Sequence, residues 1–171
     1  MLGNRGADHG CGTECFDRIL VHLMADFNFV TDRIATGAAL SSAADVEVLI
    51  AAGINTVVDC RDDFDDGPLF AGNPAINYLW NPTPDDGILK PPGYWLRSLM
   101  FVLPLLALPG SKVLCHCAAG INRGPSTAYC VMVALSFDPW TAESLIRTAR
   151  PIVGLRYAAD ALAACRALGY V

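Results

Sequence analysis

The feature that most constrains the fold is the passage from an apolar run into a helical run around residue 117. Residues 112–115 suit a short buried strand, and residues 124–136 have the apolar spacing of a helix. The turn between them runs from His116 to Arg123 and contains Cys117. A strand, a turn and a helix in immediate succession line up backbone N–H groups in a concave nest that suits a tetrahedral anion. The passage therefore predicts an anion site beside a thiol.

The residues of this turn fit a phosphate site in several respects. The helix dipole adds partial positive charge, which stabilises a thiolate at Cys117. Gly120 lets the loop curl without a Cβ penalty, and Arg123 offers a planar fork to two phosphate oxygens. His116 is expected to hydrogen-bond the loop backbone and fix the setting of the cysteine. The predicted phosphate-binding loop comprises Cys117, Ala118, Ala119, Gly120, Ile121, Asn122 and Arg123.

The rest of the chain alternates between strand-like and helical segments. Further strands are predicted over residues 27–30, 34–35, 54–60 and 76–80, and further helices over 43–52, 94–108, 139–149 and 157–168. This order implies an α/β fold with a central, mostly parallel sheet of about four or five strands and helices on both faces. The chain begins with a Gly-rich polar stretch. We therefore expect a partly flexible N-terminal arm over residues 1–22 and a single domain over 23–171.

Composition narrows the classes of partner. The formal net charge is −5 and there is no basic run, so we expect neither nucleic acid nor a membrane as a partner. The chain has seven cysteines, an odd number without the spacing of a secreted disulfide framework. We therefore expect the cysteines to be reduced thiols and the protein to be cytoplasmic. The oligomeric state is left open.

The turn resembles the signature of the protein-tyrosine phosphatase superfamily, which is His-Cys, two residues, Gly, two residues, Arg. His116, Cys117, Gly120 and Arg123 match it at every fixed position. The chain is similar to the dual-specificity type over about residues 27–168. This resemblance implies a phosphatase in which Cys117 attacks phosphorus and forms a phosphocysteine intermediate, without metal or cofactor. The implied substrate is a phosphorylated protein or peptide, carrying phosphotyrosine and also phosphoserine or phosphothreonine as an open alternative.

The same resemblance implies a general acid. Dual-specificity phosphatases carry an Asp about thirty residues before the nucleophile, and here Asp85 and Asp86 lie 32 and 31 positions upstream. We favour Asp85 by its register and because it follows Pro84. Asp86 is the alternative acid. A third interpretation is that both merely form a turn with Gly87.

One position departs from the family pattern. Ser or Thr usually follows the Arg and helps the thiolate leave in the second step, but this chain has Gly124. We expect either a slower second step or a substitute hydroxyl from Ser126. The alternative function is a phosphate-binding, pseudophosphatase-like module with impaired turnover.

Two further features carry hypotheses. Cys60 resembles the second cysteine that traps the oxidised nucleophile as a disulfide in the tensin-like lipid phosphatases, although a small buried apolar role is the usual one for a free cysteine. The acidic run over residues 62–66 is expected to form a solvated loop. The variable positions of the phosphate loop contain no Lys, which argues against inositol phospholipids and RNA 5′-triphosphates as substrates.

Overall fold

The computed structural model describes residues 25–171, so the predicted N-terminal arm and the exact start of the domain lie outside the described residues. The core is a five-stranded sheet in the order β1-β2-β5-β3-β4. Its strands are β1 (Phe27–Phe29), β2 (Ile34–Gly37), β3 (Thr56–Asp59), β4 (Asn77–Trp80) and β5 (Val113–His116). Only the edge pair β1–β2 is antiparallel. The prediction of a mostly parallel sheet of four or five strands is confirmed.

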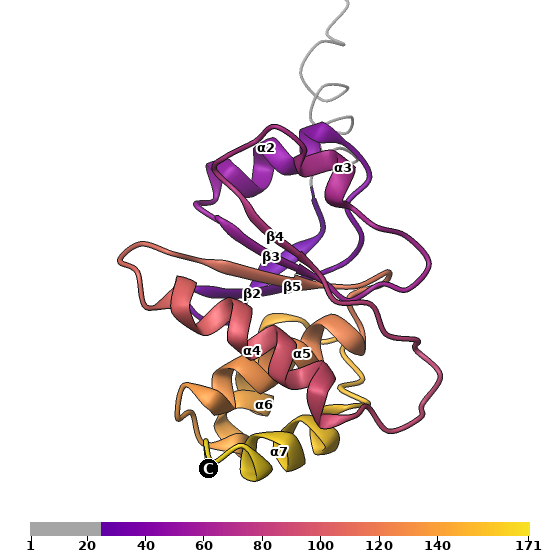
Figure 1. The fold of residues 1–171 in the computed structure, drawn as a ribbon, viewed down its shortest axis with the longest axis vertical. Coiled ribbons are helices and arrows are strands. Elements are labelled where there is room, and N and C mark those ends of the chain that lie inside the picture. Colours follow the sequence, from indigo (N-terminus) through magenta and orange to yellow (C-terminus); the bar gives the residue numbers. More distant parts are fainter. Residues whose placement is uncertain (1–24) are drawn as a thin grey trace, which may run out of the picture.

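Helices cover both faces of the sheet, as predicted (Figure 1). One face carries α2 (Ala43–Ala51) and α3 (Gly67–Phe70). The other carries α4 (Pro92–Leu106), α5 (Arg123–Ala134), α6 (Pro139–Ala149) and α7 (Ala158–Ala167). The single turn of α3 was not predicted, because four residues are too few for a helical pattern to show.

The alternation of side chains along the strands divides the core into two layers. Val57 and Leu114 pack with α2 and α3, whereas Val58 and Cys115 pack with α4 to α7. Successive side chains of a strand point to opposite faces, so a strand covered on both sides is apolar throughout. This explains the continuous apolar runs of β3 and β5.

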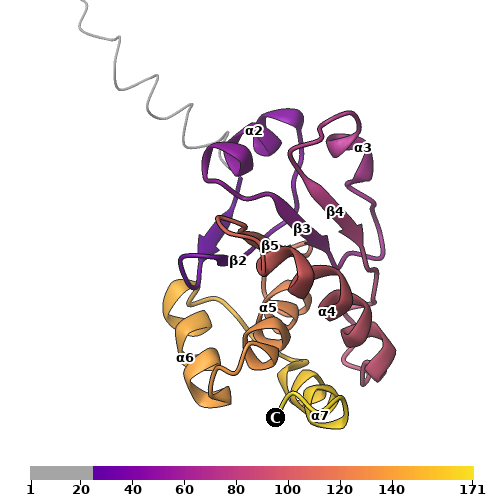
Figure 2. The same cartoon turned by 60° about the vertical axis from the view of Figure 1, so that its left-hand side comes forward.

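The central strand β5 lies between β2 and β3, and the chain turns directly from it into α5 (Figure 2). The carboxyl ends of these three parallel strands meet at one edge of the sheet. In open α/β sheets ligands bind in the crevice outside this edge. Within residues 25–171, no helix is both long and apolar enough to cross a bilayer.

Candidate active site

Cys117 occupies the first position after β5, where the central strand ends and the predicted phosphate-binding loop begins. Its backbone N–H donates to the carbonyl of Gly37 at 3.3 Å, and the Ala39 N–H donates to the carbonyl of Ala118 at 3.1 Å. The loop is thus joined to the segment that follows β2. The side chain of Cys117 is 1% exposed, so bulk water has little access to the thiol.

Gly120 gives the loop its curvature. Its φ is +64°, in the left-handed region that favours glycine. A Cβ at this position would lie 2.6 Å from the carbonyl carbon of Gly37. Both the turn and the close approach to β2 therefore require glycine, as the sequence predicts.

The loop presents a row of unused hydrogen-bond donors. The backbone N–H groups of residues 118–123 find no acceptor among residues 25–171. The first turn of α5 begins at the end of this row, and a helix N-terminus adds partial positive charge. Since an unpaired backbone N–H is costly unless a ligand or water accepts from it, the loop is suited to a ligand with several anionic oxygens.

Arg123 is held with one edge of its guanidinium free. Its Nη1 donates to Asp62 Oδ1 at 2.7 Å and to the carbonyl of Thr83 at 3.0 Å. Its Nε is buried and has no hydrogen-bond partner among the described residues. Burial works against the positive charge, but Cys117, Asp85 and Asp62 outweigh it and raise the pKa of Arg123. The side chain therefore stays charged, with its Nε edge available to an oxyanion.

Arg150 donates hydrogen bonds to the backbone carbonyls of the loop. Its Nε donates to the carbonyl of Gly120 at 2.9 Å and its Nη2 to that of Ala119 at 3.2 Å. The same guanidinium forms a bidentate pair with Asp26, at 2.7 Å to each carboxylate oxygen. This hydrogen-bonded pairing lowers the pKa of Asp26. Arg150 thus ties the loop of residues 117–123 to the segment just before β1.

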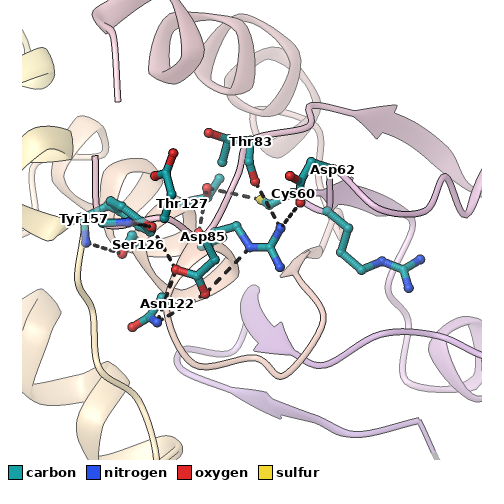
Figure 3. A network of polar contacts seen from close by, with 12 residues as sticks. Cys60, Asp62, Thr83, Asp85, Asn122, Ser126, Thr127 and Tyr157 are labelled. Carbon is teal, nitrogen blue, oxygen red and sulfur yellow. Dashed lines mark hydrogen bonds and ion pairs between the residues drawn. The ribbon is translucent and has the colours of Figure 1, made fainter. Parts of the chain in front are cut away.

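Asp85 faces the loop and Asp86 does not. The Tyr157 hydroxyl donates to Asp85 Oδ1 at 2.8 Å, and Asn122 Nδ2 donates to Oδ2 at 3.2 Å (Figure 3). Oδ2 also lies 3.9 Å from Nε of Arg123. In contrast, Asp86 pairs with Lys90 at 2.6 Å, and this hydrogen bond lowers its pKa. The geometry favours Asp85 over Asp86 as the residue that can reach a bound phosphate.

Comparison with known proteins supports the fold. The sequence matches no protein-family model and no curated protein. Human tyrosine phosphatase-like serine/threonine/tyrosine-interacting protein is similar at 14% identity and a TM-score of 0.69, over 86% of this chain and 99% of that one. A mouse protein described as a dual specificity phosphatase, complexed with zinc tungstate, has 16% identity and a TM-score of 0.67 over 98% of each chain. PTPMT1 in complex with PI(5)P has 13% identity and a TM-score of 0.67, over 84% of this chain and 99% of that one.

The fold is that of the dual-specificity phosphatases. Cys117 and Arg123 therefore lie at the two ends of a loop built on the central strand of a dual-specificity phosphatase fold. At 13–16% sequence identity these neighbours support the fold alone, so any catalytic role depends on the residues of this chain.

The expectation for His116 is wrong in one respect. Neither of its ring nitrogens has a hydrogen-bond partner among the described residues, so it does not bond the loop backbone. Alternation along β5 turns its ring to the face opposite Cys117. There Nε2 lies 3.8 Å from Asp59 and 3.7 Å from Asp66. Burial lowers the pKa of His116 to about 4, so the ring is neutral at physiological pH.

The carboxylates around His116 are partly neutralised by Arg61. Its Nε lies 3.3 Å from Asp59, and its Nη2 contacts Asp66. Burial raises the pKa of Asp66 to about 6. Asp59, Asp66 and His116 are the one set of described residues whose ligand atoms converge as a metal site requires, within 4.8 Å of one another. The guanidinium of Arg61 already supplies a cation to this set.

The solvated acidic loop expected over residues 62–66 is also partly wrong. Asp66 is fully buried against Arg61, and Asp62 bonds Arg123. Phe64 in the same stretch is exposed, and the guanidinium of Arg61 lies over its ring in a cation–π contact. Asp62 and Asp66 therefore hold arginines, Asp65 accepts from the Tyr78 hydroxyl, and Asp63 is exposed as expected.

The hydroxyl groups that follow Gly124 are engaged elsewhere. The Ser126 hydroxyl accepts from the backbone N–H of Tyr157 at 3.3 Å, and that of Thr127 donates to the carbonyl of Arg123 at 3.0 Å. Thr127 also contacts the thiol of Cys60 at 3.3 Å. A Cβ on Gly124 would lie 2.8 Å from backbone atoms of β5, which accounts physically for the glycine at this position. The substitute role of Ser126 stays a prediction.

Cys60 lies in the same buried cluster as Cys117. Burial raises the pKa of Cys60 to about 12, so its thiol carries almost no thiolate at neutral pH. A protonated thiol is a poor partner for disulfide formation, and the redox role stays a prediction. The five cysteines in the described part of the chain are all unbridged.

Sequence reasoning missed the contacts of Tyr157 and Asp62 with the site. Asp62 follows a strand end, as residues of α/β sites often do, so its position was a usable signal. Tyr157 lies 72 positions from Asp85, and nothing in its local pattern points to the site.

Proposed function

We propose that the protein is a phosphatase that hydrolyses phosphomonoesters of proteins, phosphotyrosine and also phosphoserine or phosphothreonine, through a phosphocysteine intermediate. One observation carries the proposal. In the loop that begins at Cys117, the backbone N–H groups of residues 118–123 and the Nε of Arg123 have no acceptor among residues 25–171. Such donors suit the oxygens of a phosphoryl group, which supports binding of a phosphate next to the Cys117 sulfur.

In the first step, the Cys117 thiolate attacks phosphorus in line with the ester oxygen. A sulfur–phosphorus bond forms while the phosphorus–oxygen ester bond breaks. The loop N–H groups and Arg123 hold the three equatorial oxygens, where charge is redistributed in the transition state. Asp85 gives its proton to the leaving oxygen, so an alcohol or phenol departs.

In the second step, water attacks phosphorus and displaces the Cys117 sulfur. Asp85, now ionised, accepts the proton of that water. The products are inorganic phosphate and the regenerated thiolate. Tyr157 and Asn122 donate to the carboxylate of Asp85, and these hydrogen bonds stabilise its ionised form.

The charge around the loop favours a single phosphate group. Ala118, Ala119, Ile121 and Asn122 carry no positive side chain. Asp62 and Asp85 add negative charge beside Arg123. PTPMT1 was solved with PI(5)P, but a second phosphate on a ligand of this chain would meet carboxylates here. Phosphorylated proteins or peptides are therefore the substrate class we propose.

The decisive experiment is hydrolysis of p-nitrophenyl phosphate by the reduced protein. We expect turnover by the native protein, none by Cys117→Ser, and a loss of about 10²-fold or more in Asp85→Asn on a substrate with a poor leaving group. Asp86→Asn is the matched control, since its carboxylate pairs with Lys90, and should stay within about threefold of the native rate. Absence of turnover by the native protein would refute the proposed phosphatase activity.

A second candidate follows from Gly124. No hydroxyl follows Arg123 directly, since residue 124 is glycine. Thr127 donates its hydroxyl proton to the carbonyl of Arg123, and the Ser126 hydroxyl oxygen accepts from the backbone N–H of Tyr157. A protein with a crippled second step would retain phosphate and act as a phosphate-binding module. Intact mass measurement after incubation with substrate separates the two, since such a module accumulates as phosphoenzyme or binds phosphopeptide without turnover.

A further inference from the structure

The first turn of α7 meets the loop that carries Asp85. Tyr157 precedes the helix and is 1% exposed. Its hydroxyl donates to Asp85 Oδ1 at 2.8 Å (Figure 3). The same hydroxyl oxygen accepts from the backbone N–H of Gly87 at 3.0 Å. One phenol therefore bonds both the carboxylate and the backbone of the same loop. Its own backbone N–H donates to Ser126, which fixes Tyr157 to α5.

A second contact holds the far end of this loop. The backbone N–H of Lys90 donates to Asp160 of α7 at 2.9 Å. The ammonium of Lys90 lies 4.7 Å from the centre of the Tyr157 ring and pairs with Asp86. Lys90 is only 4% exposed. The segment between Asp85 and Lys90 is thus attached to α7 at both ends.

The two oxygens of Asp85 have different surroundings. Oδ1 receives the Tyr157 hydrogen bond and points toward α7. Oδ2 lies 3.9 Å from Nε of Arg123, and Asn122 Nδ2 donates to Oδ2 at 3.2 Å and to Oδ1 at 3.4 Å. The free Nε marks the place of the phosphate, so Oδ2 is the oxygen that faces the reacting group. An oxygen that already accepts a strong hydrogen bond is the poorer site for a proton.

We propose that Tyr157 is a positioning residue that anchors the acid loop and confines the transferable proton of Asp85 to Oδ2. This rests on the proposed function, because it assigns the proton that leaves with the alcohol or phenol in the first step. The bond to Tyr157 persists in the second step, when the ionised carboxylate takes a proton from water at Oδ2. Burial, with a contribution from Asp85, raises the pKa of Tyr157, which keeps the phenol a donor throughout.

The test compares two substrates in Tyr157→Phe. Phenyl phosphate has a poor leaving group that needs the acid, whereas p-nitrophenolate leaves with little help. We expect kcat/KM for phenyl phosphate to fall by about 10-fold or more and that for p-nitrophenyl phosphate by less than about threefold. The double variant with Asp85→Asn should lose no more on phenyl phosphate than Asp85→Asn alone, because both changes remove one function.

Tyr129→Phe is the matched control. Tyr129 is a buried tyrosine of α5, and no hydrogen bond of its hydroxyl is found within residues 25–171. Its variant should leave the ratio of the two substrates unchanged. Equal losses on both substrates in Tyr157→Phe, or no loss on phenyl phosphate, would overturn the proposal.

Amide hydrogen exchange separates this inference from the proposed function. Loss of the phenol removes the acceptor of the Gly87 N–H, so this amide should exchange about 10-fold faster in Tyr157→Phe. If the native protein hydrolyses neither substrate, the proposed function and the proton assignment both fail. Faster exchange at Gly87 would then still support the anchor, and unchanged exchange would overturn that part as well.

Discussion

Replacing Gly124 by Ala tests how closely α5 is packed on the central strand. A Cβ on Gly124 would lie 2.8 Å from the carbonyl oxygen of Cys115 and 2.8 Å from both Cα and the carbonyl carbon of His116. All three neighbours are backbone atoms of β5 or its end, so no side-chain rotation relieves the contact. Either the start of the helix or the strand must shift.

The magnitude follows from two opposed effects. An added methyl group in a packed site costs typically about 1–3 kcal/mol. Ala in place of a helical Gly recovers up to about 1 kcal/mol, and less near a helix end. We therefore expect Gly124→Ala to lower the free energy of unfolding by about 1–2 kcal/mol. For a domain of this size that corresponds to a fall in Tm of roughly 2–8 °C.

Gly93→Ala is the matched control. Gly93 is the second residue of α4, as Gly124 is of α5, but a Cβ on Gly93 would meet nothing within 4 Å. Its variant should be as stable as the native protein or more stable by up to about 1 kcal/mol. Urea unfolding followed by the fluorescence of the buried Trp95 measures both. If Gly124→Ala proves as stable as Gly93→Ala, the explanation given for this glycine is wrong.

Three further predictions concern the buried charges and the reaction. Burial raises the pKa of Asp66 from 3.8 to about 6. Between these two pH values the Asp66 carboxyl is protonated in the folded protein and ionised in the unfolded chain. The contribution of Asp66 to the free energy of unfolding therefore falls as the pH rises from about 4 to about 6. In urea titrations, the free energy of unfolding of Asp66→Asn should rise by roughly 3 kcal/mol relative to that of the native protein between about pH 4 and pH 6, and the difference should be constant above pH 7. A difference that is the same at every pH would contradict the raised pKa of Asp66. Rapid mixing with p-nitrophenyl phosphate should release a burst of about one p-nitrophenol per Cys117, followed by turnover about 10-fold slower or more, and a linear trace would exclude a slow second step. Arg150→Gln should weaken inhibition by vanadate about 10-fold, whereas Arg147→Gln, which removes the surface pair with Glu143 and a hydrogen bond to the carbonyl of Val153 but no bond to the loop, should change it less than about twofold.

The order of helices and strands could be predicted because the apolar pattern is local. Strands predicted over 54–60 and 76–80 correspond to β3 and β4, and the helix predicted over 139–149 corresponds to α6. The boundaries differ by a few residues, as is usual where element ends fray. The short helix α3 lacked any periodic signal, since it holds a single turn that begins with Gly67 and Pro68.

The candidate site was predictable where its chemistry is contiguous in the chain. Cys117, Gly120 and Arg123 lie within one turn, so their spacing alone indicates a phosphate loop. The bonds of Tyr157 and Asp62 join positions that are distant in the sequence, and only the packing of α7 and the end of β3 brings them together. A local pattern carries no information about such contacts.

The orientation of His116 was available from the sequence. Counting alternate residues along β5 places Cys115 on the α5 side and His116 on the other. A histidine next to a reactive cysteine suggests direct support of the loop, but the pleat of the strand excludes it. Strand periodicity therefore outweighs adjacency when a role is assigned to a residue beside a nucleophile.

The place of β5 in the sheet has a consequence for how the protein folds. This strand is the last in the sequence, yet it lies in the middle of the sheet and pairs with both β2 and β3. The hydrogen bond from Thr36 to Cys115 spans 79 positions, so the strand docks only after long segments have closed. The loop at its end cannot acquire its curvature before that moment. A partly synthesised or partly unfolded chain therefore carries an ordinary cysteine, and the oxyanion binding that we propose requires the completed sheet.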